Sequence, residues 1–294
     1  MSETPTTVLL VGGGTGVLGR GILREIGPRY RLVSFHRRPD PQEQGQVHRY
    51  IAGDVTDEQA LLPALEGVDA IVNVVWYRPP GPDALFQRTA QGILKLARRA
   101  RERGIRKFVQ ISLPPAPEFL ERRVPYLARR RELERGLQGV PGLDLVRIQP
   151  SAVFGPRDRL IQEMRRIIRT YHLLPMWGDG HYHVSPIFAD DVGWVVGEAL
   201  EGRVPPVILV GGPDRFTYRD LSDLLFRCEG RPPRYWKVGP STGRWLVRIL
   251  NALGIHSLYT YEYEWLMSDM LGLPEPPHPG REFHRLAEFL TSPA

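Results

Sequence analysis

In the first half of the chain, short apolar runs alternate with longer segments whose apolar side chains recur every three or four positions. The apolar runs predict six strands, at residues 8–11, 31–36, 48–51, 69–75, 107–112 and 143–148. Helical spacing follows these runs, for instance in Leu18, Ile22 and Ile26 after the first strand. Strands that alternate with helices in this way predict an α/β fold of the Rossmann type, with a doubly wound parallel sheet.

Beyond residue 150 the alternation gives way to helices and short strands. An apolar stripe predicts a helix over residues 160–171, and Thr217 with Asp220 forms a capping box for another. Asp190 or Asp191 is interpreted as a helix cap, a structural role that we prefer to a catalytic one. We expect a dinucleotide-binding domain at residues 1–150 and a smaller α/β substrate lobe at residues 151–294, intertwined with the Rossmann core.

The strongest signal for chemistry lies after the first strand, where the spacing Gly-x-x-Gly-x-x-Gly begins at Gly13. Gly13 permits a tight turn, Gly16 lets the backbone approach a pyrophosphate at a helix N-terminus, and Gly19 lets the helix pack against the strand. A flexible loop is the alternative, but the flanking strand and helix supply the context that a dinucleotide site needs. The expected contacts are Gly13, Thr15, Gly16, Val17, Leu18 and Gly19.

The end of the second strand indicates which dinucleotide is bound. An acidic residue expected there for NAD is missing, and the strand runs into Arg37 and Arg38. Two guanidinium groups can bind a 2′-phosphate through charge-assisted hydrogen bonds, so NADP(H) is favoured over NAD(H). The alternative is that both arginines belong to a solvated loop of an arginine-rich protein.

The charge balance is basic, with a net charge of +6 that comes mostly from arginine. The arginines are interleaved with acids, as where Arg129, Arg130 and Arg131 precede Glu132 and Glu134. Such mixed charge is typical of a solvated helix face, and no nucleic-acid motif accompanies it. Nucleic acid is therefore not the expected partner, and a small-molecule substrate is.

The remaining bulk properties are those of an ordinary globular protein, with 42% hydrophobic and 24% charged residues. No apolar run is long enough for a transmembrane segment, and the first residues lack the features of a signal peptide. Cys228 is the single cysteine, so an intramolecular disulfide is excluded. We expect a cytoplasmic protein, and the oligomeric state stays open.

Five landmarks in order along the chain, at residues 11–19, 53–55, 108–112, 149–156 and 188–192, carry a family resemblance. The chain resembles extended and atypical short-chain dehydrogenases/reductases, nearest to the NAD-dependent epimerase/dehydratase-like group that includes NmrA-like proteins and the Rossmann-fold accessory subunit of respiratory complex I. The resemblance covers essentially the whole chain. It implies that Asp54 and Val55 contact the adenine, and that Asn73, Val74 and Ser112 lie along the ribose and nicotinamide.

Catalysis in that superfamily uses a Tyr-x-x-x-Lys pair and a serine, and the matching residues here are Tyr126, Arg130 and Ser112. Four residues apart on a helix, Tyr126 and Arg130 share a face. A fixed cation stabilises a tyrosinate, so that Tyr126 can exchange a proton with a substrate oxygen. Two departures stand against this interpretation: arginine replaces lysine, and Pro114 occupies the usual position of the serine.

Two functions follow. The first is an NADP(H)-dependent oxidoreductase that acts on a carbonyl, alcohol or sugar-like substrate, with an epimerase or dehydratase outcome left open. The alternative is a non-catalytic, NmrA-like NADP(H)-binding redox sensor or accessory subunit. His181 and His183 lack an evident third metal ligand, so we expect no metal.

Aromatic and aliphatic residues supply the last signals. Trp76, Tyr77, Trp177 and Tyr182 are candidates for an apolar substrate pocket, although core or lid positions are commoner for such residues. An apolar stripe that includes Trp245, Ile249 and Leu253 predicts a helix, and packing on the lobe is favoured over contact with a membrane or partner.

Overall fold

The computed structural model describes residues 6–14, 16–75, 83–156, 158–254, 258–277 and 280–291. Thr15 of the glycine turn lies outside the described residues, as do Trp76 and Tyr77. The chain separates into two compact units. The first contains Met1–Leu113, Glu121–Gln149 and Ala189–Ile208, and the second contains Pro114–Leu120, Pro150–Phe188 and Leu209–Ala294. The expected domain boundary at residue 150 stays a prediction.

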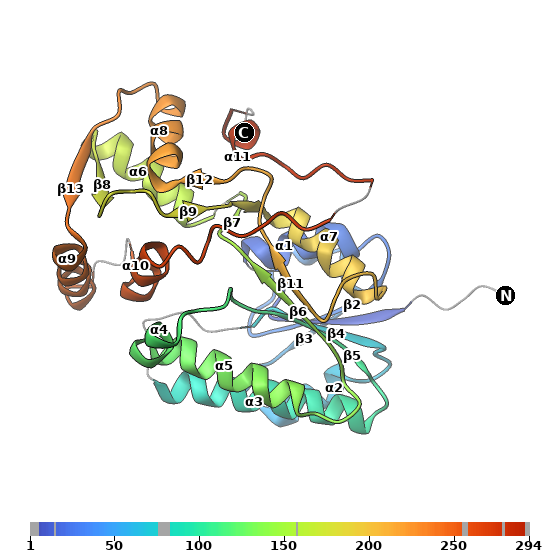
Figure 1. Ribbon diagram of the computed structural model, residues 1–294. Helices are drawn as coiled ribbons and strands as arrows, with labels where there is room; N and C mark the ends of the chain where they lie inside the picture. The colour runs from blue at the N-terminus through green and yellow to red at the C-terminus, as the bar shows by residue number, and fades with distance from the viewer. Residues whose placement is uncertain are drawn as a thin grey trace. The chain divides into compact units, whose positions relative to one another are not determined.

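A parallel sheet forms the centre of the first unit (Figure 1). Among the described residues its seven strands are β1 (Thr7–Val11), β2 (Arg31–His36), β3 (Arg49–Ala52), β4 (Ala70–Asn73), β5 (Lys107–Ile111), β6 (Asp144–Pro150) and β11 (Val207–Val210). Their order is β11-β6-β5-β4-β1-β2-β3. Val8 of β1 pairs in register with Leu32 on one side and Ala70 on the other. The strand order proceeds from β1 first to one edge, through β2 and β3, and then to the other edge, from β4 outward, which confirms the expected α/β Rossmann fold.

The seventh strand, β11, was not among the six that the sequence predicts. Arg147 N donates a hydrogen bond to Pro206 O at 2.8 Å, and Ser151 N donates one to Val210 O at 2.9 Å. Both partners advance by four residues, so β11 runs parallel to β6. Its four residues follow the stretch in which the regular alternation has stopped, and a short apolar run there is a weak signal.

Helices cover the sheet of the first unit. They are α1 (Val17–Ile26), α2 (Glu58–Ala64), α3 (Asp83–Glu102), α5 (Pro125–Gln138) and α7 (Ala189–Leu200), with a 3₁₀ turn at Pro41–Glu43. Figure 1 shows α3 and α5 together on one side of the sheet and α1 with α7 on the other. Asp57 caps α2 by accepting hydrogen bonds from Gln59 N and Ala60 N.

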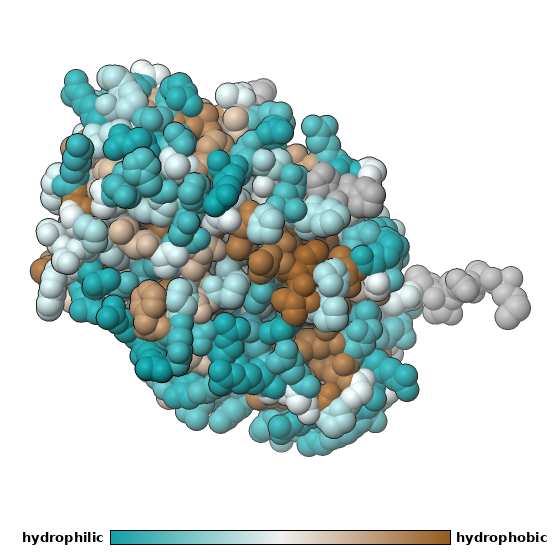
Figure 2. All heavy atoms as spheres, in the orientation of Figure 1, coloured by the Kyte–Doolittle hydropathy of each residue, from teal (hydrophilic) through white to brown (hydrophobic). Residues whose placement is uncertain are grey.

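Burial in the first unit follows the apolar periodicity. Val8, Leu9, Leu10 and Val11 of β1 are fully buried because helices cover both faces of the sheet. Leu9, Ile71 and Phe108 from three neighbouring strands pack with helix residues in one core. On the face shown in Figure 2, hydrophilic side chains dominate the region over α3 and α5. These outer sides carry the interleaved charges that the sequence places there.

The second unit is built from helices and two-stranded sheets. Its strands β7 (Val153–Phe154) and β10 (Ile187–Phe188), β9 (His183–Val184) and β12 (Phe216–Thr217), and β8 (Leu174–Trp177) and β13 (Tyr235–Val238) form three pairs. Its helices are α6 (Leu160–Tyr171), α8 (Tyr218–Cys228), α9 (Pro240–Ala252), α10 (Thr260–Met267) and α11 (Leu286–Thr291). The remaining helix, α4 (Glu118–Arg123), contributes residues to both units.

Two local predictions for the second half are confirmed. A helix, α6, occupies residues 160–171, and Thr217 and Asp220 form the expected capping box at the start of α8. Asp190 and Asp191 lie in the first turn of α7, where their charges complement the helix dipole. Within the part of the chain that the structure describes, no helix is long and apolar enough to cross a membrane.

Candidate functional site

The turn between β1 and α1 is shaped by glycine. Gly12 and Gly14 adopt left-handed backbone angles, with φ of +79° and +72°. A Cβ on Gly13 would stand 2.1 Å from the Leu10 side chain, and one on Gly19 would stand 2.7 Å from Gly14 N. Larger residues would therefore displace the turn or the helix.

The N-terminus of α1 is open where a phosphate would bind. Gly16 precedes the helix in an extended conformation, and a Cβ there would have no atom within 4 Å among the described residues. The first turn contains no acidic residue. Free N–H groups at a helix N-terminus can bind an anion when the first turn of that helix carries no acid, so this end of α1 fits the pyrophosphate of a dinucleotide.

Arginines surround this turn. Arg20 on α1 donates from Nε to Gly14 O at 2.9 Å and pairs through Nη2 with Asp40 at 3.0 Å. Arg37 and Arg38 follow the last residue of β2 and are exposed. Arg20 thus fixes the turn, while the two loop arginines are accessible to an anion.

Glu43 is a residue of this region that sequence reasoning missed. Its side chain is buried and accepts hydrogen bonds from Ser34 Oγ at 3.1 Å and from His36 Nε2 at 2.8 Å. A Cβ on Gly14 would stand 1.4 Å from Glu43 Oε1, so the carboxyl group lies directly against the glycine turn. Gly14 and Glu43 are 29 positions apart, and no sequence pattern links them.

The other residues expected at the dinucleotide follow β3 and β4. Asp54 accepts hydrogen bonds from Thr56 N at 2.9 Å and Thr56 Oγ1 at 2.8 Å, and Val55 is buried in the core. Asn73 ends β4 and donates to Gln110 Oε1 at 2.9 Å, and Val74 N donates to Val11 O at 3.0 Å. The carboxyl ends of parallel strands share one edge, so these residues and the glycine turn lie along that edge.

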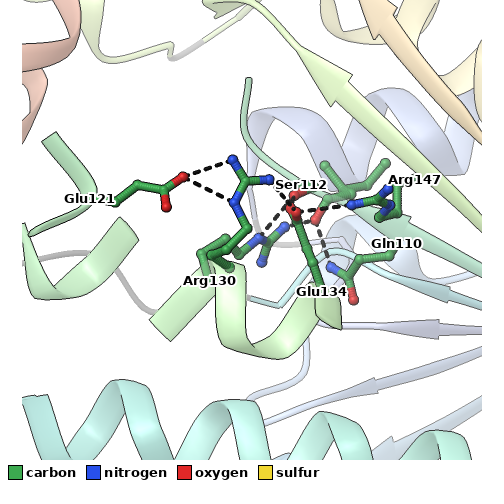
Figure 3. Close-up of polar contacts among 8 residues, drawn as sticks. Gln110, Ser112, Glu121, Arg130, Glu134 and Arg147 are labelled. Carbon is green, nitrogen blue, oxygen red and sulfur yellow. Dashed lines mark hydrogen bonds and ion pairs between the residues drawn. The ribbon is translucent and has the colours of Figure 1, made fainter. Parts of the chain in front are cut away.

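The three candidate catalytic residues gather beyond the end of β5. Tyr126 begins α5, is 5% exposed and packs edge-on against Phe86 with ring centroids 5.4 Å apart. Arg130, one turn later, is buried; its Nε donates to Ser112 Oγ at 3.2 Å and its Nη2 donates to Ile111 O (Figure 3). Burial lowers the pKa of Arg130, and the nearby Tyr126 and Glu134 oppose that shift.

Glu134 completes this cluster and was also missed. Ser112 Oγ donates to Glu134 Oε1, while Arg147 and Arg131 pair with Oε2 at 3.1 Å and 3.2 Å. Figure 3 shows these groups converging between α5 and the strands. The interpretation of the whole arginine and glutamate run as a solvated face is wrong for Arg130 and Glu134, which are 4% and 2% exposed. The spacing of four between them was the available signal.

The sequence model of the NAD dependent epimerase/dehydratase family matches residues 9–211, which include both groups of site residues. The chain belongs to this family. The expected resemblance is therefore confirmed, and it agrees with the Rossmann fold of the sheet.

Two relatives differ in what their names describe. Subunit 9 of the NADH dehydrogenase [ubiquinone] 1 alpha subcomplex from Arabidopsis thaliana, a mitochondrial protein, is 25% identical over 81% of this chain and 61% of its own length. The (4-alkanoyl-5-oxo-2,5-dihydrofuran-3-yl)methyl phosphate reductase of Streptomyces griseus is 28% identical over 81% of this chain and 79% of its own. The chain thus spans less than two thirds of the Arabidopsis protein.

Solved structures show the same fold. A nucleoside-diphosphate-sugar epimerase from Staphylococcus aureus aligns over 98% of this chain and 100% of its own, with a TM-score of 0.74 and 15% identity. The enzyme WbmH from Bordetella bronchiseptica, solved in complex with NAD+, covers 80% of this chain and 86% of its own, with a TM-score of 0.65 and 15% identity.

Proposed function

We propose that this protein is a cytoplasmic NADP(H)-dependent oxidoreductase that acts on a carbonyl, alcohol or sugar-like small molecule. The observation that carries the proposal is the grouping of Tyr126, Arg130 and Ser112 at the strand edge that also bears the glycine turn. A bound nicotinamide dinucleotide would supply or accept a hydride at this edge. The Streptomyces reductase, by its name, carries out a reduction, which supports the reaction class.

In this proposal each of the three residues has a separate role. Tyr126 exchanges a proton with the substrate oxygen. Arg130 supplies a fixed positive charge one helical turn away, which favours the tyrosinate form. Ser112 accepts a hydrogen bond from Arg130 and donates one to Glu134, so it positions the guanidinium group.

The dinucleotide residues in the proposal are Gly13, Thr15, Gly16, Val17, Leu18 and Gly19 for the pyrophosphate, and Asp54, Val55, Asn73 and Val74 along the rest of the cofactor. Arg37 and Arg38, both exposed, bind the 2′-phosphate of NADP(H). Glu43 is the nearby group that could oppose a phosphate. Both of its oxygens already accept hydrogen bonds from protein donors and its side chain is 4% exposed, so we assign it to support of the turn.

Substitution of Tyr126 by phenylalanine tests the catalytic role. A panel of carbonyl substrates is first screened for oxidation of NADPH by the wild-type protein. For any substrate found, Tyr126→Phe is expected to lower kcat by about 10²–10⁴-fold because the proton donor is lost. Tyr30→Phe removes a hydroxyl that bonds to Glu201 on the surface and is the matched control. NADPH affinity, measured by calorimetry, should be unchanged in both variants.

A second function is favoured by one specific observation. Inside the protein Arg130 donates to Ser112, which donates to Glu134, and such a network can serve stability alone. The name of the Arabidopsis relative describes a subunit of a larger assembly. If Tyr126→Phe turns over substrate as fast as the wild type, the acid/base role is refuted, and an NADP(H)-binding redox sensor or accessory subunit becomes the better account.

A further inference from the structure

A row of large apolar side chains lies exposed on α9 of the second unit, the helix so labelled in Figure 1. Trp245, Ile249 and the adjoining Leu253 are 63%, 54% and 70% exposed. Positions spaced by four lie on one face of a helix. Packing on the lobe, which the sequence favoured for this stripe, is therefore wrong for these three residues.

The opposite side of α9 is the one that packs. Val247 is 2% exposed and belongs to the core of the second unit, and a Cβ on Gly243 would stand 2.7 Å from Tyr263 Oη. Tyr263 Oη in turn donates to Pro240 O at 2.7 Å. The inner side of α9 thus holds the helix on the second unit, and the outer apolar row is exposed for contact with a binding partner.

Positive charge accompanies the apolar row. Arg248 lies on the same face and places its guanidinium carbon 5.6 Å from the Trp245 ring centroid. Arg234 and Lys237, just before α9, are exposed, as is Trp236 at 52%. No aspartate or glutamate occurs between Glu229 and Glu262 in the sequence. Residues 234–237 and α9, called here the α9 surface, therefore carry exposed cations and apolar groups and have no acid in their own sequence.

The combination of cations and apolar side chains favours some binding partners of the α9 surface over others. A second copy of the chain would bring arginines and lysines against one another, which like-charge repulsion opposes. An anionic lipid surface offers phosphates for the cations and an acyl boundary for tryptophan, isoleucine and leucine side chains. We propose that the α9 surface binds the interface of an anionic lipid bilayer. The protein then attaches peripherally, through one helix that lies along the membrane, and this inference does not depend on the enzymatic proposal.

Flotation of the full chain with lipid vesicles tests the proposal. Wild-type protein is mixed with vesicles of phosphatidylcholine alone or of phosphatidylcholine with phosphatidylglycerol, at low and high salt. We expect binding to the anionic vesicles at low salt, loss of that binding at high salt, and none to the neutral vesicles. Arg248→Gln should weaken binding about fivefold, and the triple variant Trp245→Ser, Ile249→Ser, Leu253→Ser about tenfold or more.

Matched controls distinguish binding through the α9 surface from nonspecific electrostatic or hydrophobic binding to vesicles. Arg98→Gln removes an exposed cation on α3, and Tyr171→Ser removes an exposed aromatic residue on α6; neither should change vesicle binding. Circular dichroism and NADPH titration establish that the variants remain folded. The proposal is overturned if wild-type protein binds neither vesicle, if the triple variant binds as well as the wild type, or if the α9 surface instead mediates a dimer that the triple variant dissolves.

Discussion

Arg130 has a planar guanidinium group where the family pattern has lysine, and the planar group determines which hydrogen-bond acceptors the side chain reaches. Its Nε and Nη2 reach two different acceptors, Ser112 Oγ and Ile111 O, which a single ammonium group meets with different geometry. The positive charge is buried and needs a carboxylate, and Glu134 lies one turn further along α5. The family resemblance predicted the pair Tyr126 and Arg130. Glu134 was missed although its spacing of four from Arg130 was an available signal, and Glu43 was missed because the glycine turn that it contacts lies 29 positions earlier in the sequence.

Glu134→Gln tests the buried charge cluster. Removing this carboxylate takes the counter-charge of Glu134 from Arg130 and Arg147, while Arg131 keeps its ion pair with Glu121, so we expect a loss of about 3 kcal/mol in the free energy of unfolding. Urea denaturation measures it. Glu132→Gln on the same helix removes a side chain that is 52% exposed, and it should cost about 0.5 kcal/mol or less. Equal effects of the two substitutions would contradict the account.

Asp158 gives a prediction about pH. Its side chain is 3% exposed, accepts from Ile161 N at 2.8 Å, and has its pKa raised from 3.8 to about 6, chiefly by burial. The folded state therefore holds a proton that the unfolded state releases, so stability falls as pH rises from about 4 to about 6. Asp158→Asn keeps the acceptor and removes the titration; it should abolish this slope and stabilise the protein at pH 7 by about 3 kcal/mol.

Chemical denaturation across this pH range measures the slope contributed by Asp158. Asp179→Asn is the matched control, because Asp179 is exposed and accepts a similar backbone hydrogen bond from His181 N. It should leave the pH dependence unchanged. An Asp158→Asn variant with the wild-type slope would show that another group titrates.

At the scale of elements, α1 and α7 show that a sequence pattern can predict a helix without predicting what the helix packs against. The stripe of Leu18, Ile22 and Ile26 and the glycine spacing predict α1 and its turn, because that information is local. Residues 192–199 are predicted as helical, but no local signal says that this helix packs on α1. The contact depends on glycines in both helices that allow the backbones to approach closely, and this role cannot be inferred without knowing that the two helices pack together. β11 was missed for a related reason, since its partner β6 lies about 60 residues earlier.

Gly21→Ala tests the contact between these helices. A Cβ on Gly21 would stand 2.4 Å from the backbone of Ala189, and a Cβ on Gly193 would stand 2.6 Å from Gly21 O. Backbone atoms cannot move aside as a side chain can, so the steric cost of the added methyl group should exceed the gain in helix propensity. We expect the free energy of unfolding, measured by urea denaturation, to fall by about 2 kcal/mol. Gly139→Ala, where the added Cβ meets only ordinary contacts at 3.5 Å and 3.6 Å, should change stability by about 0.5 kcal/mol or less. A neutral Gly21→Ala would show that the helices can separate.

At the scale of the whole molecule, the family match explains why the fold was predictable and the substrate was not. The family supplies a glycine turn, a sheet order and a Tyr-x-x-x-Lys position that can be recognised from spacing. In our proposal the second unit selects the substrate, and its residues form a core of their own without a motif for a particular ligand. The dinucleotide site is therefore the part of the functional account that a single experiment can test most directly.

That experiment is a calorimetric titration of the protein with NADPH and, separately, with NADH. We expect NADPH to bind more tightly, and the double substitution Arg37→Ala, Arg38→Ala to weaken NADPH by about tenfold while NADH is little changed. Glu43→Gln should leave the ratio of the two affinities as it is, because its carboxyl group is used within the protein. Tighter binding of NADH would contradict the assignment of the 2′-phosphate, and binding of neither dinucleotide would contradict the site itself.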